Sequence, residues 1–397
     1  MSGALQGLKV VSLGFSVSAP LCARFLADMG ADVIKVERPE TGDFARSWDE
    51  VLPGVSSAHL WCNPNKRSIT LNLKTPKGRA ALGRLADRAD VFLENFSPGV
   101  VARLGIDYAW AKAINPRLIY CHISGYGQDG PYRDMKALDM LIQGEAGAIY
   151  LTGPPETPAK VALSIADSSA SLFATVAILA ALEQRRRTGE GQEIDVSMFD
   201  CLVSLLGYLP YQYLYGGEEP QRVGLRHHLI APYGPWPARD GKLVNISVAT
   251  PELWKTFCEL IGRPDLTEDP RFETNPDRVK NLQALDREIE AAFEKEDAAV
   301  WMEKLKAVGI PCGAVNRIPE VIDHPQAKFR QLLREVSSTG GNGGGNPLKL
   351  FDFPVKFSRA QTRLEPPPRL GEHTDAVLAE LGFSALEVEE LRREGAV

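Results

Sequence analysis

Several signatures that usually identify the chemistry of a protein are missing from this sequence of 397 residues. Its six cysteines are widely scattered and contain no C-x-x-C pair, which argues against both a disulfide framework and a zinc site. The six histidines include no pair with metal-ligand spacing, because His227 and His228 are neighbours and point apart on any regular element. We therefore expect no metal and a location in the reducing cytoplasm.

Positive charge and a targeting segment are missing as well. The net charge of −6 and the sequence pI of about 5.7 argue against nucleic acid or an anionic membrane as the main partner. The stretch "MSGALQGLKVVSLGF" has no basic residues ahead of an apolar core, so we expect no signal peptide. One apolar run follows Asp167, but it fades into serine and threonine and ends in "EQRRR", which is typical of a buried helix rather than a membrane span.

The common nucleotide and hydrolase motifs are also missing. The first strand-to-helix turn reads "GFSVSAP" and lacks the G-x-G-x-x-G glycines that let a backbone approach a dinucleotide. The run "GRAALGRL" lacks the Gly-Lys-Ser/Thr ending of a P-loop, and no G-x-S-x-G elbow occurs. We therefore expect neither a nucleotide cofactor nor a serine hydrolase.

What the sequence does contain is an alternation of strands and helices near its start. We expect strands at 8–14, 31–37, 68–74, 90–96 and 118–127, and helices at 18–30, 75–89 and 97–105. Ser18 and Thr75 are expected to cap two of these helices, and Ser97 to open the third. The alternation predicts a Rossmann-like α/β domain with a parallel sheet, whose ligands bind beyond the carboxyl ends of the strands. Helix starts at Ser18 and Ser97 favour anions such as phosphate there.

A second, smaller α+β domain is expected after this large domain. The change in composition predicts a large domain at 1–208 and 331–397, a linker at 209–230, a small domain at 231–325 and a linker at 326–330. Within the small domain we expect a strand near 242–249 and helices at 251–262, 276–295 and 298–309. The glycine-rich segment near 340–345 reads as a flexible turn, and two short amphipathic helices follow from 371.

Asp167 is the residue of greatest interest, because it begins the long apolar run "SSASLFATVAILAALEQRRRTGEGQ". The simpler interpretation is a helix cap that accepts hydrogen bonds from the first turn. The alternative is a reactive carboxylate that the helix start keeps ionised, since carboxylates act as covalent nucleophiles toward activated acyl groups. The residues alone favour the cap.

Motifs along nearly the whole chain point to a known family. They include "GADVIKVERPETGDFAR", "CNPNKRSITLNLKTPKGR", "ADVFLENFSPGVVARLG", "SGYGQDGPY", "IADSSASLFATVAILAALEQRRRTGEGQEIDVSMFD", "DPRFETNPDRVKN", "AVGIPCGAV" and "LGEHTD". Together and in this order they resemble the class III CoA-transferases of the CaiB-BaiF type, the group that includes formyl-CoA transferase and carnitine CoA-transferase.

The resemblance implies that Asp167 is the catalytic nucleophile and that the large domain binds coenzyme A as an acyl-CoA substrate. It implies an aspartyl anhydride and then an aspartyl-CoA thioester, with oxyanion donors from the backbone after Asp167 or from a loop of the second domain or a second subunit. Positive side chains and helix starts suit the phosphates of CoA. The residues assigned to CoA by this resemblance are Ser16, Val17, Ser18, Arg38, Leu71, Asn72, Leu73, Lys74, Asn95, Phe96, Ser97, Arg103, Lys136 and Met198.

The substrate acid stays open at this level. Formyl-CoA transferases carry Gln in the first loop and Lys where Ser124 stands, which puts a formyl-CoA:oxalate activity in doubt. The segment "RVGLRHHLIAPYG" resembles members that act on C4–C5 dicarboxylates, including intramolecular transfer within one dicarboxyl-CoA. Candidate substrate contacts are Asp139, Gln143, Arg222, Arg226, His227 and His228, although Asp139 either lines the acyl site or only hydrogen-bonds within it.

Two further readings are weaker. The 2-methylacyl-CoA racemases of the same fold group carry His directly before the aspartate of the segment that matches "KALDMLIQG", where this chain has Leu138, which cannot carry a proton. The sequence offers nothing positive for a CoA-binding protein without catalytic activity. The resemblance also implies an interlocked homodimer in which each subunit passes through a ring of the other.

Overall fold

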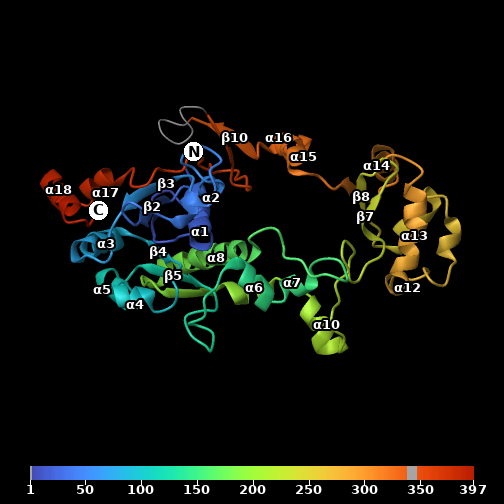
Figure 1. The fold of residues 1–397 in the computed structure, drawn as a ribbon, viewed down its shortest axis with the longest axis horizontal. Coiled ribbons are helices and arrows are strands. Elements are labelled where there is room, and N and C mark those ends of the chain that lie inside the picture. The colour runs from blue at the N-terminus through green and yellow to red at the C-terminus, as the bar shows by residue number, and fades with distance from the viewer. Residues whose placement is uncertain (1, 338–346) are drawn as a thin grey trace. The chain divides into compact units, whose positions relative to one another are not determined.

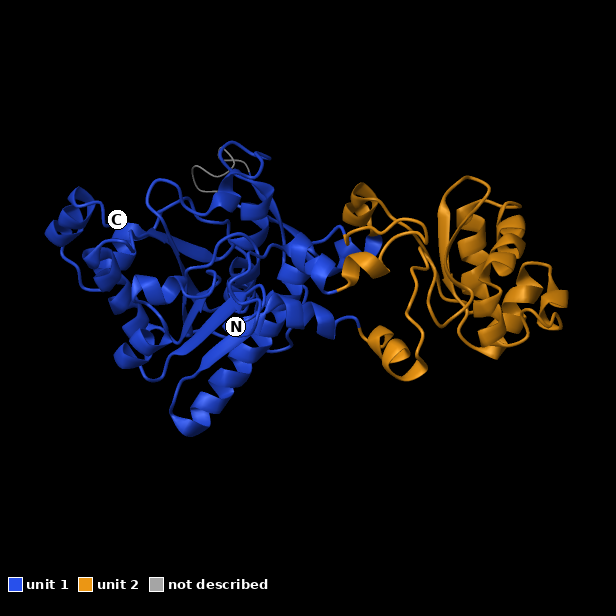
Figure 2. Cartoon of the chain, turned by 60° about the horizontal axis from the view of Figure 1, so that its bottom comes forward, with its two compact units in different colours: residues 1–146, 162–206, 325–397 blue, residues 147–161, 207–324 orange. Residues whose placement is uncertain are grey.

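The computed structural model describes residues 2–337 and 347–397, and the chain forms two compact units. Unit 1 comprises residues 1–146, 162–206 and 325–397, and unit 2 comprises residues 147–161 and 207–324 (Figure 2). The expected linker at 209–230 belongs to unit 2 and includes a helix, and the expected linker at 326–330 is helical as well. The expected glycine-rich turn near 340–345 lies outside the described residues.

Residues 147–161 belong to unit 2, not to the large domain that the sequence predicts. Arg222 explains the difference, because its guanidinium donates to the backbone carbonyls of Tyr150, Pro154 and Pro155 at 2.7, 3.3 and 3.0 Å. These contacts join two segments that are far apart in the sequence, so no local sequence pattern predicts them.

Unit 1 is an α/β unit built on a six-stranded, wholly parallel sheet, as the sequence predicts (Figure 1). The strand order is β3-β2-β1-β4-β5-β6, so the order reverses between β1 and β4. In open sheets the crevice at such a reversal is where ligands bind. The strands are β1 Lys9–Ser12, β2 Asp32–Glu37, β3 Lys66–Thr70, β4 Val91–Glu94, β5 Ile119–Ser124 and β6 Glu193–Ser197.

Helices cover both faces of this sheet. Helices α1 and α8 pack on each other and on one face, while α3 and α5 lie over the other, where they share an apolar core with the C-terminal helices α17 and α18 (Figure 1). The helices of unit 1 are α1 Ser18–Asp28, α2 Ser57–Cys62, α3 Pro76–Arg88, α4 Val100–Leu104, α5 Tyr108–Ile114, α6 Asp139–Glu145, α8 Ile165–Thr188, α9 Met198–Ser204, α16 Pro325–Arg330, α17 Thr374–Glu380 and α18 Ala385–Arg393. A 3₁₀ turn at Phe44–Ser47 and an antiparallel pair, β10 Leu333–Val336 and β11 Leu348–Phe351, complete the unit.

The predicted helix starts are correct in only one of three cases. Thr75 caps α3, since its hydroxyl accepts the N–H of Gly78 at 3.0 Å. Ser18 is instead the first helical residue of α1, after Val17 at the cap position. Ser97 does not open a helix, because α4 begins at Val100 after a left-handed Gly99. Both serines therefore have side chains that are free of a capping role.

Unit 2 has a separate core of aromatic and aliphatic side chains, including Trp236, Phe257, Phe293 and Trp301. The expected helix at 276–295 is two helices that meet at Asn281. The strands β7 Tyr233–Pro237, β8 Leu243–Ser247 and β9 Cys312–Ala314 form an antiparallel sheet. The helices are α7 Ala148–Leu151, α10 Leu209–Gly216, α11 Pro251–Leu260, α12 Asn275–Lys280, α13 Leu282–Phe293, α14 Ala298–Ala307 and α15 Ile318–Asp323, with a 3₁₀ turn at Pro264–Thr267.

The apolar helix α8 packs closely on α1 through small side chains. Ser171 Oγ donates to the carbonyl of Ser18 at 2.7 Å, and Thr175 Oγ1 donates to Cys22 Sγ at 3.4 Å. By length and composition alone α8 could cross a membrane, but core helices of soluble proteins pass the same test. Its opposite face leaves Leu172 and Val176 56% and 64% exposed.

We predict that Ala174→Leu destabilises unit 1 by about 1–3 kcal/mol, because Ala174 lies fully buried on the face of α8 that carries Ser171 and Thr175. The measurement is urea unfolding followed by circular dichroism. The exposed Glu183→Ala on the same helix serves as the control and should change stability by less than about 0.5 kcal/mol. Equal stability of the two variants would mean that α1 and α8 are not closely packed.

Candidate active site

The turn after β1 approaches the start of α1 unusually closely. A Cβ atom on Gly14 would lie only 2.7 Å from Ala19 Cβ and 2.9 Å from Pro20 Cδ, so this position requires glycine. Ser16 adopts a left-handed backbone conformation with a φ of 63°, which is uncommon outside glycine and asparagine. The segment from Gly14 to Ser18 is therefore a strained turn at the carboxyl end of the central strand.

Asn95, just after β4, holds this turn from the neighbouring strand. Its Oδ1 accepts the N–H of Phe15 at 3.0 Å, and its Nδ2 donates to the carbonyl of Phe15 at 2.9 Å and to Ser18 Oγ at 3.1 Å. β1 and β4 are adjacent where the strand order reverses, so one side chain can join the two loops. The side-chain amide of Asn95, which the sequence assigned to CoA binding, is therefore already hydrogen-bonded to the Phe15–Ser18 segment.

Asp167 lies in the first turn of α8 and does not cap that helix. The cap position is Ser164, and its side chain makes no capping hydrogen bond. The Asp167 carboxylate instead lines a cavity together with Ser18, whose hydroxyl and backbone N–H act to lower the pKa of Asp167. The backbone after Asp167 offers no free donor at Ser168, whose N–H donates to the carbonyl of Ser164 at 2.9 Å, so the expected oxyanion site is not at that position.

Asp139, at the start of α6, supplies the cap that Asp167 was expected to provide. Its Oδ1 accepts the N–H of Ala166 at 2.8 Å and lies 3.4 Å from the N–H of Asp167. Gln143 is completely buried one turn later, and its amide donates to Asp139 Oδ2 at 2.7 Å and to the carbonyl of Leu163 at 3.2 Å. Asp139 and Gln143 thus fix the start of α8, with a second carboxylate beside Asp167.

The surroundings of Asp167 oppose its ionisation. The pKa of Asp167 is raised from the ordinary 3.8 to about 7, chiefly by burial and also by the nearby Asp139 carboxylate, while the polar groups of Ser18 act in the opposite direction. Desolvation and a like charge therefore act against the ionisation that the start of α8 favours. A carboxylate with a raised pKa is also a more basic nucleophile.

Asp167 faces a small cavity of about 130 Å³ at the reversal between β1 and β4. The only charged side chains among its lining residues are Asp139 and Asp167. The sequence also assigned Ser16, Ser18, Asn95, Phe96, Ser97 and Met198 to the site, and all six line this cavity. It did not assign Phe15, Phe44, Pro98, Ile123, Ser124, Gly125, Met135, Ala137 and Leu138, which line it too.

A second cavity of about 1160 Å³ adjoins the first, since Phe15, Phe96 and Ser97 line both. It lies over the carboxyl ends of β1 to β4 and contains seven residues that the sequence assigned to CoA, namely Arg38, Leu71, Asn72, Leu73, Lys74, Phe96 and Ser97. Arg38 and Lys74 supply positive charge beside apolar walls, which fits a ligand with phosphates and an extended, mostly neutral arm.

The C-terminal segment contributes to this large cavity in a way that the sequence does not reveal. Arg392, Gly395 and Val397 line it together with Leu370, Gly371 and Thr374. The backbone N–H of Asn72 donates to the carbonyl of Ala396 at 2.8 Å, and its side chain donates to the carbonyl of Gly395 at 3.0 Å. The end of the chain therefore holds the Leu71–Lys74 turn, and only the long-range fold brings them together.

Three residues assigned to CoA lie outside both cavities. Val17 is buried behind the turn with Leu21 and Cys62. Arg103 and Lys136 are exposed on unit 1 and line neither cavity. Their assignment stays a prediction that depends on the family resemblance alone.

The four basic side chains expected to meet the substrate belong to unit 2 and have partners there. Arg226 donates to Asp286 at 2.9 Å and to the carbonyl of Pro235 at 2.8 Å, and its guanidinium stacks on Trp236. Arg222 is engaged by backbone carbonyls as described above. We therefore interpret Arg222 and Arg226 as residues that hold unit 2 together.

The two histidines are also engaged. His227 Nδ1 accepts the N–H of Leu229 at 3.0 Å, and its Nε2 lies 3.2 Å from the hydroxyl of Tyr208. Partial burial and the neighbouring His228 lower the pKa of His227, so it is a poor partner for an anion at neutral pH. His228 Nε2 lies 2.9 Å from the carbonyl of Gln221. Among the described residues no group of three or more His, Cys, Asp or Glu side chains could hold a metal ion.

We predict that Asp167→Asn stabilises the protein by about 1–3 kcal/mol at pH 8. The pKa of Asp167 is raised on folding, so the folded state takes up a proton that the unfolded chain lacks, and stability falls as the pH rises from about 4 to 7. The gain should disappear at pH 4. Urea unfolding at both values tests this, with the exposed Asp200→Asn in the first turn of α9 as control. A gain that is equal at both pH values would contradict the raised pKa.

Comparisons with known proteins agree with this geometry. The family described as CoA-transferase family III matches residues 5–374. A succinate–glutarate CoA-transferase of Agrobacterium fabrum is 36% identical over 388 residues, which cover 95% of either chain. A formyl-CoA:oxalate CoA-transferase of Streptomyces avermitilis is 35% identical over an alignment of 424 residues that covers 100% of both chains.

A solved structure supports the same assignment. The crystal structure of a CAIB/BAIF family protein from Brucella suis has a TM-score of 0.84 and 37% identity, and the match covers 96% of this chain and 100% of that one. The sequence match, the fold and the cavity at the strand reversal agree, so this chain belongs to CoA-transferase family III and is a CoA-transferase that uses CoA thioesters.

Proposed function

We propose that this protein transfers CoA from an acyl-CoA to a carboxylic acid through covalent intermediates on Asp167, with C4–C5 dicarboxylates as substrates. The observation that carries the covalent part is the position of Asp167, which faces a small cavity that adjoins the large one. A thioester carbonyl in the small cavity can then meet Asp167 while the rest of CoA occupies the large cavity. The raised pKa of Asp167 supports a nucleophilic role.

The reaction proceeds by four exchanges at carbonyl carbons. A carboxylate oxygen of Asp167 attacks the carbonyl carbon of the thioester. The C–S bond breaks, CoA departs as the thiolate, and an acyl-aspartyl anhydride remains on the protein. The thiolate attacks the aspartyl carbonyl, which releases the first acid and forms an aspartyl-CoA thioester. The acceptor carboxylate attacks this thioester and expels the thiolate. The thiolate finally attacks the acceptor's acyl carbon and frees Asp167, so charge and atoms balance at each step.

The charge of the small cavity supports a C4–C5 acid over oxalate. Its lining residues include two carboxylates and no basic side chain. In oxalate the second carboxylate lies directly beside the reacting one and would meet Asp139 and Asp167. In a C4 or C5 acid the second carboxylate lies several bonds away and can extend out of the cavity, which reduces the repulsion. The relatives do not decide between the two, because the one from Agrobacterium fabrum is named for succinate and glutarate and the one from Streptomyces avermitilis for oxalate.

The positions that distinguish formyl-CoA transferases fall in this cavity. Ser124, where those enzymes carry Lys, lines it, and so do Phe15, Ser16 and Ser18 of the first loop. The racemase alternative receives no support, because no histidine occurs among the lining residues and Leu138 occupies the position of the racemase histidine.

We infer a homodimer from two observations taken together. The family resemblance implies interlocked subunits, and unit 1 exposes large apolar side chains around the site. Leu138, Met140 and Leu141 near the start of α6 are 65%, 59% and 52% exposed. Leu172 and Val176 on α8 are exposed as well. Large exposed apolar side chains on neighbouring helices are typical of an interface between subunits when they form one patch.

We predict that acyl-CoA labels Asp167 covalently. Incubation with succinyl-CoA and hydroxylamine should convert Asp167 to its hydroxamate, which peptide mass spectrometry detects. Asp167→Asn should lower kcat by about 10⁴-fold or more, because it removes the attacking group. The exposed Asp200→Asn is the control and should retain activity. Full activity of Asp167→Ala, with no label in the wild-type protein, would refute the covalent mechanism.

We predict that acceptor preference depends on the charge of the small cavity. With succinyl-CoA as donor, glutarate, itaconate and mesaconate should be accepted with higher kcat/KM than oxalate. Ser124→Lys should shift the oxalate-to-glutarate ratio of kcat/KM toward oxalate by about tenfold or more, because the ammonium pairs with the second carboxylate. Ser124→Met, which adds comparable bulk without charge, is the matched control. A preference of the wild-type enzyme for oxalate or for monocarboxylates would contradict the assignment.

A further inference from the structure

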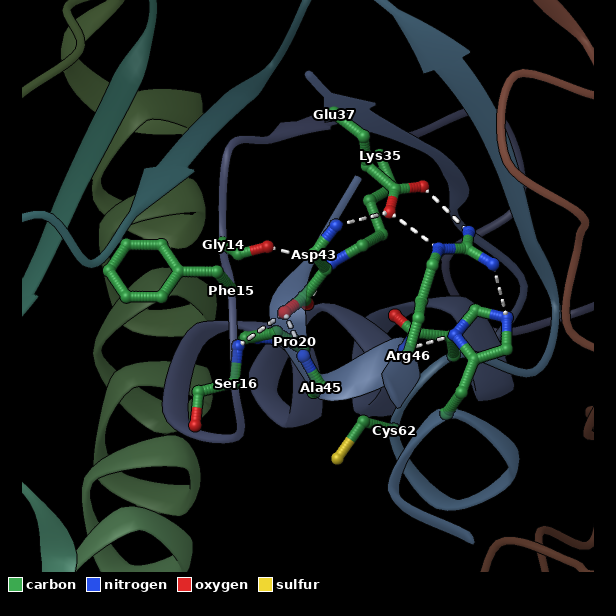
Figure 3. Close-up of polar contacts among 12 residues, drawn as sticks. Gly14, Phe15, Ser16, Pro20, Lys35, Glu37, Asp43, Ala45, Arg46 and Cys62 are labelled. Carbon is green, nitrogen blue, oxygen red and sulfur yellow. Dashed lines mark hydrogen bonds and ion pairs between the residues drawn. The ribbon is translucent and has the colours of Figure 1, made fainter. Parts of the chain in front are cut away.

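Lys35 on β2 is completely buried, yet it lines neither cavity and has no part in the proposed reaction. Its ammonium donates to the carbonyl of Gly14 at 2.7 Å and to Asp43 Oδ2 at 2.8 Å (Figure 3). A lysine is almost never fully buried unless it is paired. The two partners of Lys35 connect it to the strained turn after β1.

Asp43 connects the pair to the same turn a second time. It is buried, and its Oδ1 accepts the N–H of Ser16 and the N–H of Ala45, both at 3.0 Å (Figure 3). Its own backbone N–H donates to Glu37 Oε1 at 3.1 Å, and Glu37 pairs with Arg46 at 2.8 Å. Asp43 is therefore held in one position by the neighbouring ion pair.

The Gly14–Ser18 turn is thus held by residues that follow or lie on both strands that neighbour β1, namely β2 and β4. Lys35 and Asp43 hold Gly14 and Ser16 from β2 and the loop after it, while Asn95 holds Phe15 from the end of β4. The left-handed conformation of Ser16 needs such support, because a residue other than glycine keeps it only where its surroundings impose it.

Ser18, two residues beyond Ser16, lines the small cavity together with Asp167, and its carbonyl accepts the hydroxyl of Ser171 on α8 at 2.7 Å. Its polar groups lower the pKa of the Asp167 carboxyl. We propose that the buried Lys35–Asp43 pair is a positioning device for the catalytic aspartate. The pair acts through the Gly14–Ser18 turn, because the position of this turn determines where the hydroxyl and the backbone N–H of Ser18 lie relative to the Asp167 carboxylate. This proposal rests on the proposed function, in which Asp167 is the nucleophile.

The alternative is that the pair only stabilises the fold. A purely structural pair affects how much protein is folded but not how fast the folded protein reacts. A positioning pair affects the rate of attack by Asp167 and the pH at which Asp167 ionises, with little effect on acyl-CoA binding. The two roles therefore differ in kcat, KM and pH dependence.

The test compares three changes at the pair with a matched control. Asp43→Ala removes the contact between Asp43 and the N–H of Ser16, whereas Asp43→Asn keeps one oxygen that can accept it. Lys35→Met combined with Asp43→Leu removes both charges and so avoids an unpaired buried ion that would block folding. The control is Asp28→Asn, which breaks the Arg24–Asp28 pair, also buried on unit 1 but without contact to the Gly14–Ser18 turn.

We predict that Asp43→Ala and the double variant label Asp167 about 100-fold more slowly than wild type in a single turnover with succinyl-CoA and hydroxylamine, while KM for succinyl-CoA stays close to wild type. The acid limb of the labelling rate should move to higher pH, because displaced polar groups of Ser18 stabilise the ionised carboxylate less. Asp43→Asn should recover part of the rate. Asp28→Asn should keep the rate and the acid limb.

Two results separate the possible failures. Wild-type enzyme that never labels Asp167 overturns the proposed function and this proposal with it. Wild-type enzyme that labels Asp167, while Asp43→Ala and the double variant label as fast as Asp28→Asn per folded molecule, overturns the positioning role alone.

Discussion

The close packing of α1 on α8 is the interaction on which the rest of the site depends. Ser171 and Thr175 of α8 donate hydrogen bonds to α1 through their hydroxyl groups. The two helices therefore approach each other through small polar side chains rather than bulky ones. That approach places Ser18, the first residue of α1, beside Asp167 in the first turn of α8. The packing of the core and the position of Asp167 are therefore one constraint, because a shift of either helix would separate Ser18 from Asp167.

The site also places two carboxylates side by side without a basic side chain among the residues that line their cavity. Asp139 is satisfied by the start of α8 and by Gln143, and Asp167 by Ser18. Each carboxylate has neutral donors, which limit the cost of burial without cancelling its charge. This arrangement raises the basicity of Asp167, as the proposed attack on a thioester requires. A cationic partner would lower its pKa and weaken it as a nucleophile.

Two adjoining cavities differ in the charge of the residues that line them. The large one has positive charge at Arg38 and Lys74 and is closed on one side by the end of the chain, whereas the small one has only negative charge. Phe15, Phe96 and Ser97, which follow β1 and β4, line both cavities and mark where they meet. The division follows from the strand order, since the crevice between β1 and β4 opens where the two halves of the sheet separate.

By itself the sequence determined the parallel α/β sheet, because apolar strands alternate with capped helices, and it determined the family, because its motifs occur in a distinctive order. It also singled out Asp167, for which local propensity suggested a cap and the family resemblance a nucleophile. Only the tertiary structure decided that Asp139 performs that capping, that Arg226 is paired with Asp286, and that Gly395 and Ala396 hold the Leu71–Lys74 turn. Each of these joins residues that are distant in the chain, and hydrophobic periodicity carries no information about which distant side chains meet.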